Sequence, residues 1–283
     1  MSIPNVFAAL VDDAAIFPPG SLPLPEAIIA HAAQRNSRYE ALAGPFVLGT
    51  GDLAAAAQLA TPDLFPEPLP VSIVVPTPDA LAETIETADD LRVTVRALEV
   101  KLDRSEPLIP QVTTIANHDR RGITTHIEVP RPTHPEWPEL LAAIAAHDLR
   151  LKFRTGGTQS DAFPDESELA TWIHDAARHT TPFKCTAGLH NAIRHTDPET
   201  GFEHHGFLNI LCATASALDN AETDSLATIL AERNPTALTN ALGDTNPRTL
   251  FVSYGSCSLA ESYEDLAALG LLDNRPGPSA SPR

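Results

Sequence analysis

Lysine is scarce in this chain. Only three lysines occur in 283 residues, Lys101, Lys152 and Lys184, so arginine supplies the other sixteen of the 19 basic residues. Two of the three lie inside apolar, strand-like runs, and Lys101 follows another such run. Because lysine ordinarily lies on protein surfaces, this distribution suggests that the lysines have a role inside the fold.

Positive charge in general is also in short supply. The 37 acidic residues outnumber the 19 basic ones and give a formal net charge of −18. A field of that sign repels nucleic-acid phosphates and anionic bilayers, so we expect neither nucleic acid nor a membrane as a partner. An anionic small molecule would need a local cluster of cations.

Long hydrophobic runs are absent, and cysteines are few. No apolar run approaches the roughly 18–20 residues of a membrane span. The first residues contain neither a basic region nor a small-residue cleavage site, so we expect no secretion. The three cysteines are odd in number and far apart, which predicts reduced thiols in a cytoplasmic protein rather than disulfides or a metal site.

Eight strand-like runs alternate with amphipathic helical stretches. This alternation predicts an α/β fold with a parallel sheet, and eight units predict a single-domain (β/α)8 TIM barrel over residues 4–273. A doubly wound open sheet is the alternative, but the segment after the first run has no glycine-rich dinucleotide turn. We expect a poorer helix around 107–120, an insertion at about 191–206 after the seventh strand, two helices between 206 and 242, and a disordered tail at 274–283. The expected strands are 5–11, 45–49, 71–77, 92–100, 123–130, 149–157, 182–190 and 249–258.

The sixth and seventh strands carry the most informative residues. Period-two alternation turns Lys152 and Arg154 toward the barrel axis, and Lys184 likewise. Each lysine stands four residues before a glycine, Gly156 or Gly188, so the two lysines are expected at similar heights on adjacent strands. Mutual repulsion and desolvation would then lower a lysine pKa, and a neutral lysine attacks carbonyl carbons to form a Schiff base.

Two other interpretations of these cations remain open. The cations would pair with barrel carboxylates such as Glu99 or Glu128 in a structural layer of charge, or they would hold an anion without covalent chemistry. Glu128 is expected to be the counter-ion of Arg154 or Lys184, or to act in catalysis.

Four strand ends resemble those of class I aldolases of the deoxyribose-phosphate aldolase type. The matching segments are Lys152-Phe-Arg-Thr-Gly156 for the Schiff-base lysine, Lys184-Cys-Thr-Ala-Gly188-Leu189 for a second lysine, Gly255-Ser256-Cys-Ser258-Leu259 on the eighth strand and, loosely, Asp12-Asp13-Ala-Ala-Ile-Phe-Pro18 on the first.

The resemblance implies a carbon–carbon lyase acting on a small carbonyl compound, with no cofactor. Lys152 would attack the carbonyl, Lys184 would assist by lowering its pKa, and Glu99 would shuttle protons, with Asp12 beside them. An anionic part of the substrate would contact Arg154 and Glu128, and the loops that carry the glycines and serines. Those loop residues are Gly156, Gly157, Gly188, Gly255, Ser256 and Ser258. The chain departs from the family at Glu99, where the family has aspartate, and at His190-Asn191, where it has a basic residue.

A metal-dependent lyase or hydrolase is a second hypothesis. His190, with Asp12 or Asp13, would bind a divalent metal ion, and metal-dependent lyases of the 3-hydroxy-3-methylglutaryl lyase type are similar in outline. A third hypothesis is a non-catalytic barrel that binds an anionic metabolite through Lys152, Arg154 and Lys184. In all three the partner is a small carbonyl compound or an anionic metabolite, and a homo-oligomer is left open.

Overall fold

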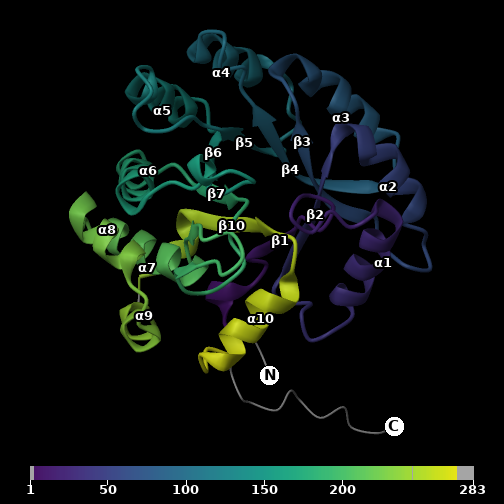
Figure 1. Ribbon diagram of the computed structural model, residues 1–283. Helices are drawn as coiled ribbons and strands as arrows, with labels where there is room; N and C mark the ends of the chain where they lie inside the picture. Colours follow the sequence, from purple (N-terminus) through teal and green to yellow (C-terminus); the bar gives the residue numbers. More distant parts are fainter. Residues whose placement is uncertain (1–2, 244, 273–283) are drawn as a thin grey trace, which may run out of the picture.

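The fold is a closed eight-stranded parallel β-barrel surrounded by helices, a TIM barrel (Figure 1). The computed structural model describes residues 3–243 and 245–272, so residue 273 and the expected tail at 274–283 lie outside the described residues. Each strand pairs with its sequence neighbour, and the last strand closes the barrel between the seventh and the first. The barrel strands are β1 Val11–Asp13, β2 Ala43–Gly49, β3 Leu69–Val75, β4 Val93–Lys101, β5 Thr124–Glu128, β6 Arg150–Arg154, β7 Phe183–Thr186 and β10 Phe251–Ser256.

The helices form the outer ring, and each of the eight barrel strands is followed by a helix before the next barrel strand begins. Helix α8 packs against both α6 and α7, and α9 packs against α7, whose residues are nearly all buried. Three helices therefore lie between β7 and β10, where the sequence predicts two. The helices are α1 Leu24–Arg35, α2 Leu53–Leu59, α3 Leu81–Asp89, α4 Leu108–Asn117, α5 Trp137–Ala146, α6 Glu166–Arg178, α7 Phe207–Leu218, α8 Thr223–Ala231, α9 Pro235–Ala241 and α10 Leu259–Ala268.

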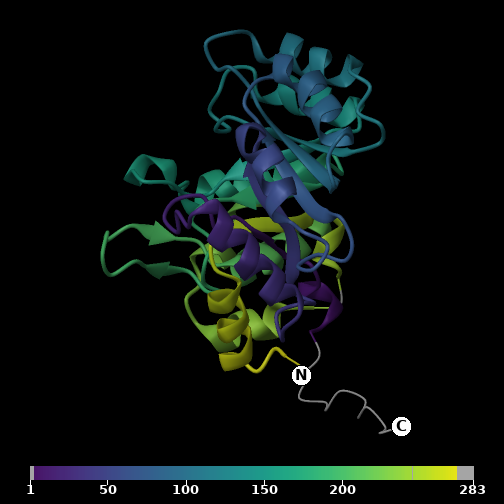
Figure 2. The same cartoon turned by 90° about the vertical axis from the view of Figure 1, so that its right-hand side faces the viewer.

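A small antiparallel hairpin, β8 His195–Thr196 and β9 Glu203–His204, lies between β7 and α7. In Figure 2 it projects at the left, on the same side as the loop that follows β6. The buried Arg194 holds its base, because the guanidinium bonds to Glu166 at 2.7 Å and contacts Glu203 at 3.3 Å.

The apolar core lies between the barrel and the helices. Phe153 stacks on Trp172 of α6 with ring centroids 4.9 Å apart, and Phe183 packs between Phe153 and Phe251. These side chains leave the barrel outward, as the alternation in 149–157 and 182–190 predicts. The other face of the same strands is polar, unlike the branched aliphatic filling that is usual in such barrels.

The first strand begins later than expected. Residues Asn5–Phe7 form a turn of 3-10 helix, and only Val11–Asp13 pair in the barrel. Asp12 and Asp13 are therefore strand residues whose side chains point to opposite faces. No helix in the described ranges is long and apolar enough to cross a membrane.

Candidate active site in the barrel interior

A layer of charged side chains fills the carboxyl half of the barrel interior. The register pairs Lys152 with Lys184 on neighbouring strands, at the equal height that the spacing to Gly156 and Gly188 predicts. Both lysines are almost fully buried, with 2% and 1% of their surface exposed. Charges this deep are costly unless they are paired, so their partners decide what the layer can do.

Glu99 of β4 lies between the two lysines. Its Oε2 accepts from Lys152 Nζ at 2.8 Å, and its Oε1 accepts from Lys184 Nζ at 2.5 Å. The Ser72 hydroxyl donates to Oε1 at 2.6 Å. One carboxylate therefore bridges both ammonium groups, and a proton leaving either lysine has a shared acceptor.

Each lysine has a second carboxylate of its own. Lys184 donates to Asp12 Oδ2 at 2.5 Å, an oxygen that also accepts from the Ser253 hydroxyl at 2.8 Å. Lys152 Nζ lies 3.0 Å from Glu128 Oε2, and Arg154 Nε donates to Oε1 of the same residue at 3.1 Å. Glu128 is thus the counter-ion of Lys152 and Arg154, and Lys184 pairs with Asp12 and Glu99. Three carboxylates face three cations.

This pairing reverses the expected pKa shift of Lys184. Burial by itself would lower the pKa, but the nearby charges of Asp12 and Glu99 outweigh burial and raise it above the usual lysine range. The expectation of a depressed lysine pKa is therefore wrong for Lys184. It counted the repulsion between the ammonium groups and omitted the carboxylates around them.

The carboxylates respond to the same charges. Burial opposes ionisation of Glu99, but Lys152 and Lys184 hold its pKa well below the usual range. Burial acts likewise on Glu128, and Lys152 and Arg154 lower its pKa to about 2. For Asp12 burial prevails over the attraction of Lys184, and its pKa is raised.

The two adjacent aspartates of β1 serve different partners. Asp12 faces the axis and pairs with Lys184, whereas Asp13 faces outward and contacts His31 Nδ1 of α1 at 2.8 Å. Asp13 also accepts from the backbone N–H of Ala15. His31 is fully buried, so Asp13 connects the end of β1 to its following helix.

His195 and His204 pack with ring centroids 5.2 Å apart, but the four histidines after β7 do not form one group. His190 Nδ1 lies 3.1 Å from Glu261, whereas the buried His205 contacts the carbonyl of Pro164 and the guanidinium of Arg194. Asp13 has His31 as its partner. Within the described ranges, no group of three or more His, Cys, Asp or Glu side chains is arranged to hold a metal ion.

Cys257 has a histidine companion that the sequence does not reveal. Its Sγ lies 3.7 Å from His190 Nδ1, the same nitrogen that faces Glu261. Burial and the charges of Glu261 and Asp13 raise the pKa of this thiol, which opposes its acting as a nucleophile.

Two of the expected anion-binding glycines pack against each other. A Cβ on Gly156 would lie 2.7 Å from the Cα of Gly188, and Gly188 has a φ of +73° and faces the carbonyl of Thr155. A Cβ on Gly157 would lie 2.7 Å from that of Ala162. These glycines allow the loops after β6 and β7 to touch. Gly255 differs, because a Cβ there would make only ordinary contacts.

The expected serines are engaged locally. The Ser256 hydroxyl accepts from the backbone N–H of Ser258, and the Ser258 side chain accepts from the N–H of Glu261 at the start of α10. Both hydroxyls therefore serve the turn between β10 and α10.

Three interior residues were missed as candidates. Ser72 and Ser253 bond the two central carboxylates, and their position on the inward face of apolar strands was the available signal. His126 lies 3% exposed inside the barrel, and neither ring nitrogen has a hydrogen-bond partner among the described residues. Burial and the charge of Lys184 hold its pKa well below the usual range, so the ring is neutral.

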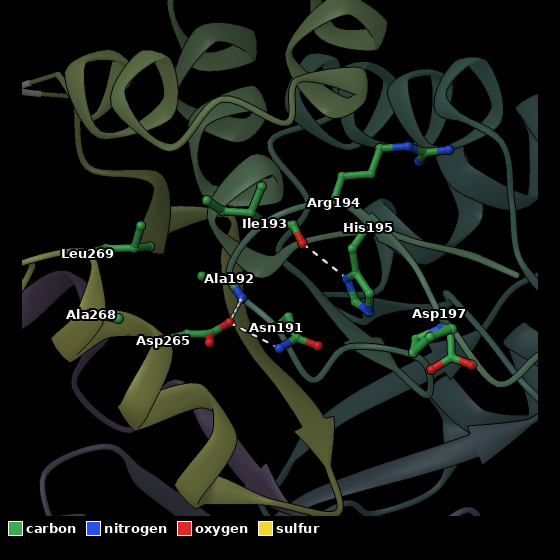
Figure 3. A pocket seen from close by; sticks show the side chains of 10 residues that line it. Asn191, Ala192, Ile193, Arg194, His195, Asp197, Asp265, Ala268 and Leu269 are labelled. Atoms are coloured by element: carbon green, nitrogen blue, oxygen red, sulfur yellow. Dashed lines mark hydrogen bonds between the residues drawn. The ribbon is translucent and has the colours of Figure 1, made fainter. Parts of the chain in front are cut away.

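A hollow between the segment after β7 and α10 lies outside the barrel. It has a volume of about 540 Å³ and lies between Asn191–Pro198 and the end of α10 (Figure 3). Asp265 occupies one wall and bonds Asn191 and the N–H of Ala192, while the side chain of Arg194 points away from the hollow. The charged layer is therefore separate from this space.

Comparison with known proteins places the chain in no established family. No protein-family model matches the sequence, and no curated protein matches it. A function for the chain therefore has to be inferred from the barrel and the arrangement of its buried charges.

Proposed function

We propose that this barrel is a class I aldolase-like carbon–carbon lyase that acts on a small carbonyl compound through a Schiff base on Lys152. The observation that carries the proposal is the bridge of Glu99 between Lys152 and Lys184, two buried amines at equal height near the carboxyl end of the barrel. Active sites of TIM barrels lie at that end. The resemblance of four strand ends to the deoxyribose-phosphate aldolase type supports the same roles.

The two lysines have different environments, and this supports different roles for them. Lys184 has a raised pKa and contacts two carboxylates, so it remains an ammonium group. Lys152 shares Glu128 with Arg154, whose side chain is 38% exposed, so its side of the layer lies nearer the solvent. A substrate arriving from the carboxyl end meets Lys152 first.

The reaction needs Lys152 as a free amine. Its proton passes to Glu99 or Glu128, the carboxylates in contact, and Nζ then adds to the carbonyl carbon. Nζ gives up a second proton to the carbonyl oxygen, and the carboxylate returns the first one, so the oxygen departs as water and leaves an iminium ion while Lys184 stays an ammonium group beside Glu99. The carbon–carbon bond breaks as its electron pair moves toward the iminium, a carboxylate takes the proton of the β-hydroxyl, and Glu99 returns a proton to the enamine. Hydrolysis restores the amine.

Reductive trapping tests this proposal directly. The protein is mixed with acetaldehyde, pyruvate or dihydroxyacetone, reduced with borohydride and mapped by peptide mass spectrometry. With only three lysines in the chain, assignment is simple. We expect one stable adduct, on Lys152, and none at that position in Lys152→Arg. Arginine is the matched variant because it keeps the positive charge between Glu99 and Glu128 but is not a nucleophile at neutral pH.

Other outcomes reassign the site. An adduct on Lys184 would keep the chemistry and exchange the two roles. No adduct with any carbonyl compound would contradict the proposal and favour a barrel that binds an anionic metabolite without turnover.

The three free thiols fit a cytoplasmic setting for either activity.

A further inference from the structure

Lys101 has no part in the buried layer, yet it shares the face of β4 that carries Glu99. Leu98 and Val100 are fully buried on the opposite face, so alternation puts Lys101 on the inner side, at the last position of the strand. It is exposed, and no ion pair or hydrogen bond of its ammonium group is found among the described residues.

Lys101 and Arg154 stand on either side of Glu128. The register pairs Lys101 with Glu128 and Glu128 with Lys152, and Arg154 follows Lys152 by two residues on β6. Arg154 contacts Glu128 through Nε alone. Its two terminal nitrogens and the ammonium group of Lys101 are therefore donors near the carboxyl ends of β4 and β6, the strand that carries the candidate nucleophile.

The charges near Lys101 and Arg154 indicate which kind of anion these two residues can bind. Asp12, Glu99 and Glu128 pair with Lys152, Lys184 and Arg154, whereas Lys101 has no carboxylate partner among the described residues. One unpaired positive charge beside Arg154 matches a carboxylate. A phosphate monoester carries about −1.5 to −2 at neutral pH and would leave negative charge uncompensated.

The loops that would bind a phosphate group of the substrate are also engaged in contacts of their own. Gly156 and Gly188 are packed against each other, and the hydroxyls of Ser256 and Ser258 are bonded in their own turn. The two serine hydroxyls are therefore engaged within the turn after β10, and the cations Lys101 and Arg154 lie on β4 and β6.

We propose that Lys101 and Arg154 bind the carboxylate of the substrate, so that the substrate class is a small oxo acid whose carbonyl group reaches Lys152. The guanidinium of Arg154 offers two parallel N–H donors that match a carboxylate, and Lys101 adds a point charge. This inference rests on the proposed Schiff-base function and adds a specificity-determining residue, Lys101, that the aldolase resemblance does not supply.

The test compares a charged and a neutral ketone of similar size. Borohydride trapping on Lys152 is titrated with pyruvate, with acetone and with dihydroxyacetone phosphate. We expect Lys101→Met to reduce the preference for pyruvate over acetone about tenfold, the loss that corresponds to about 1.4 kcal/mol. Lys101→Arg should retain most of the preference. Arg96→Met is the matched control, because it removes an exposed cation from the amino half of the same strand.

The carboxylate inference and the Schiff-base proposal would fail with different experimental results. If wild-type protein forms the adduct and Lys101→Met keeps the preference for pyruvate, the inference is overturned and the Schiff-base proposal stands. A wild-type preference for dihydroxyacetone phosphate over pyruvate overturns the assignment of a carboxylate. If no carbonyl compound is trapped, the Schiff-base proposal fails, and calorimetric titration with pyruvate decides the carboxylate site: binding that weakens in Lys101→Met supports it, and no binding overturns it.

Discussion

Glu99 is the residue on which the buried charges converge. It contacts both lysines and Ser72, and it is 1% exposed. Without its charge, two ammonium groups would face each other at the distance of adjacent strands, about 5 Å. The carboxylate of Glu99 binds both ammonium groups and offsets their repulsion. For this reason two buried lysines are compatible with the folded barrel.

Glu128 gives a prediction about pH at the residue scale. Its pKa falls from 4.5 to about 2 on folding, because Lys152 and Arg154 outweigh burial. A depressed carboxyl pKa stabilises the fold above the unfolded value and loses that effect as the pH falls toward the folded value. At pH 7 we expect Glu128→Gln to lower the free energy of unfolding by about 3 kcal/mol, a loss that shrinks steadily between pH 5 and pH 2.

Denaturant unfolding between pH 7 and pH 3 measures this difference. Glu86→Gln is the control, because Glu86 is exposed on α3 and its substitution should change stability by less than about 0.5 kcal/mol at any pH. A difference between wild type and Glu128→Gln that stays constant with pH would contradict the assignment of the ion pairs.

The contact between the loops after β6 and β7 matters at the scale of elements. Gly156 and Gly188 meet with no room for a side chain, and Thr155 adds a hydrogen bond from its hydroxyl to the carbonyl of Ala187 at 2.7 Å. The two strands that carry the lysines are thereby held together just beyond Arg154 and Thr186.

The variant Gly156→Ala tests the close contact between the loops after β6 and β7. The new Cβ would lie 2.7 Å from the Cα of Gly188, so the backbones must separate, and we expect a loss of about 1–3 kcal/mol in unfolding free energy. Gly51→Ala is the matched control, because nothing lies within 4 Å of a Cβ at that position and no loss is expected. Thermal or denaturant unfolding of both variants measures the effect, and equal stabilities would refute the tight packing.

At the scale of the whole molecule, closure of the barrel joins residues that are distant in the chain. Lys184 bonds Asp12 across 172 positions and Glu99 across 85. The pair of Lys184 with Asp12 joins β7 to β1, the two strands between which β10 completes the ring. The interior is neutral overall, so the net charge of −18 resides mainly on the outer surface.

That surface charge predicts how salt affects stability. Self-repulsion weakens a compact state of high net charge, and added salt screens it within a Debye length of about 8–10 Å at 0.10–0.15 M. We expect the melting temperature at pH 7 to rise by about 3 °C between 10 mM and 300 mM sodium chloride. Near the isoelectric point of about 4.9 the rise should vanish. A melting temperature that falls with salt at pH 7 would show that surface ion pairs outweigh the repulsion.

Local patterns account for much of what could be predicted. The alternation of apolar runs and helical stretches predicted the eight-stranded barrel, and the period of two in 150–154 and 183–186 predicted which side chains face inward. The spacing from each lysine to a glycine predicted the equal height of Lys152 and Lys184. All of these features are properties of short segments, so neighbouring residues suffice to reveal them.

The partners of those side chains could not be read in the same way. Nothing in the sequence near Lys184 indicates that Asp12 rather than Glu128 is its second counter-ion, or that Ser72 and Ser253 bond the carboxylates. The late start of β1, the third helix before β10 and the contact of Asp13 with His31 were also missed. Pairing of this kind depends on strand register and on closure of the ring, which are set by the packing of the whole chain.

The raised pKa of Lys184 is a further property that depends on the tertiary structure and not on short segments of the sequence. The sequence predicts that two lysines are buried on adjacent strands, and this suggests repulsion and a lowered lysine pKa. It does not reveal which carboxylates lie beside them. Inward orientation follows from the pleat of a strand and is local. The balance of charge around the ammonium group of Lys184 depends on distances of a few ångströms between β7, β1 and β4, and only the folded barrel establishes those distances.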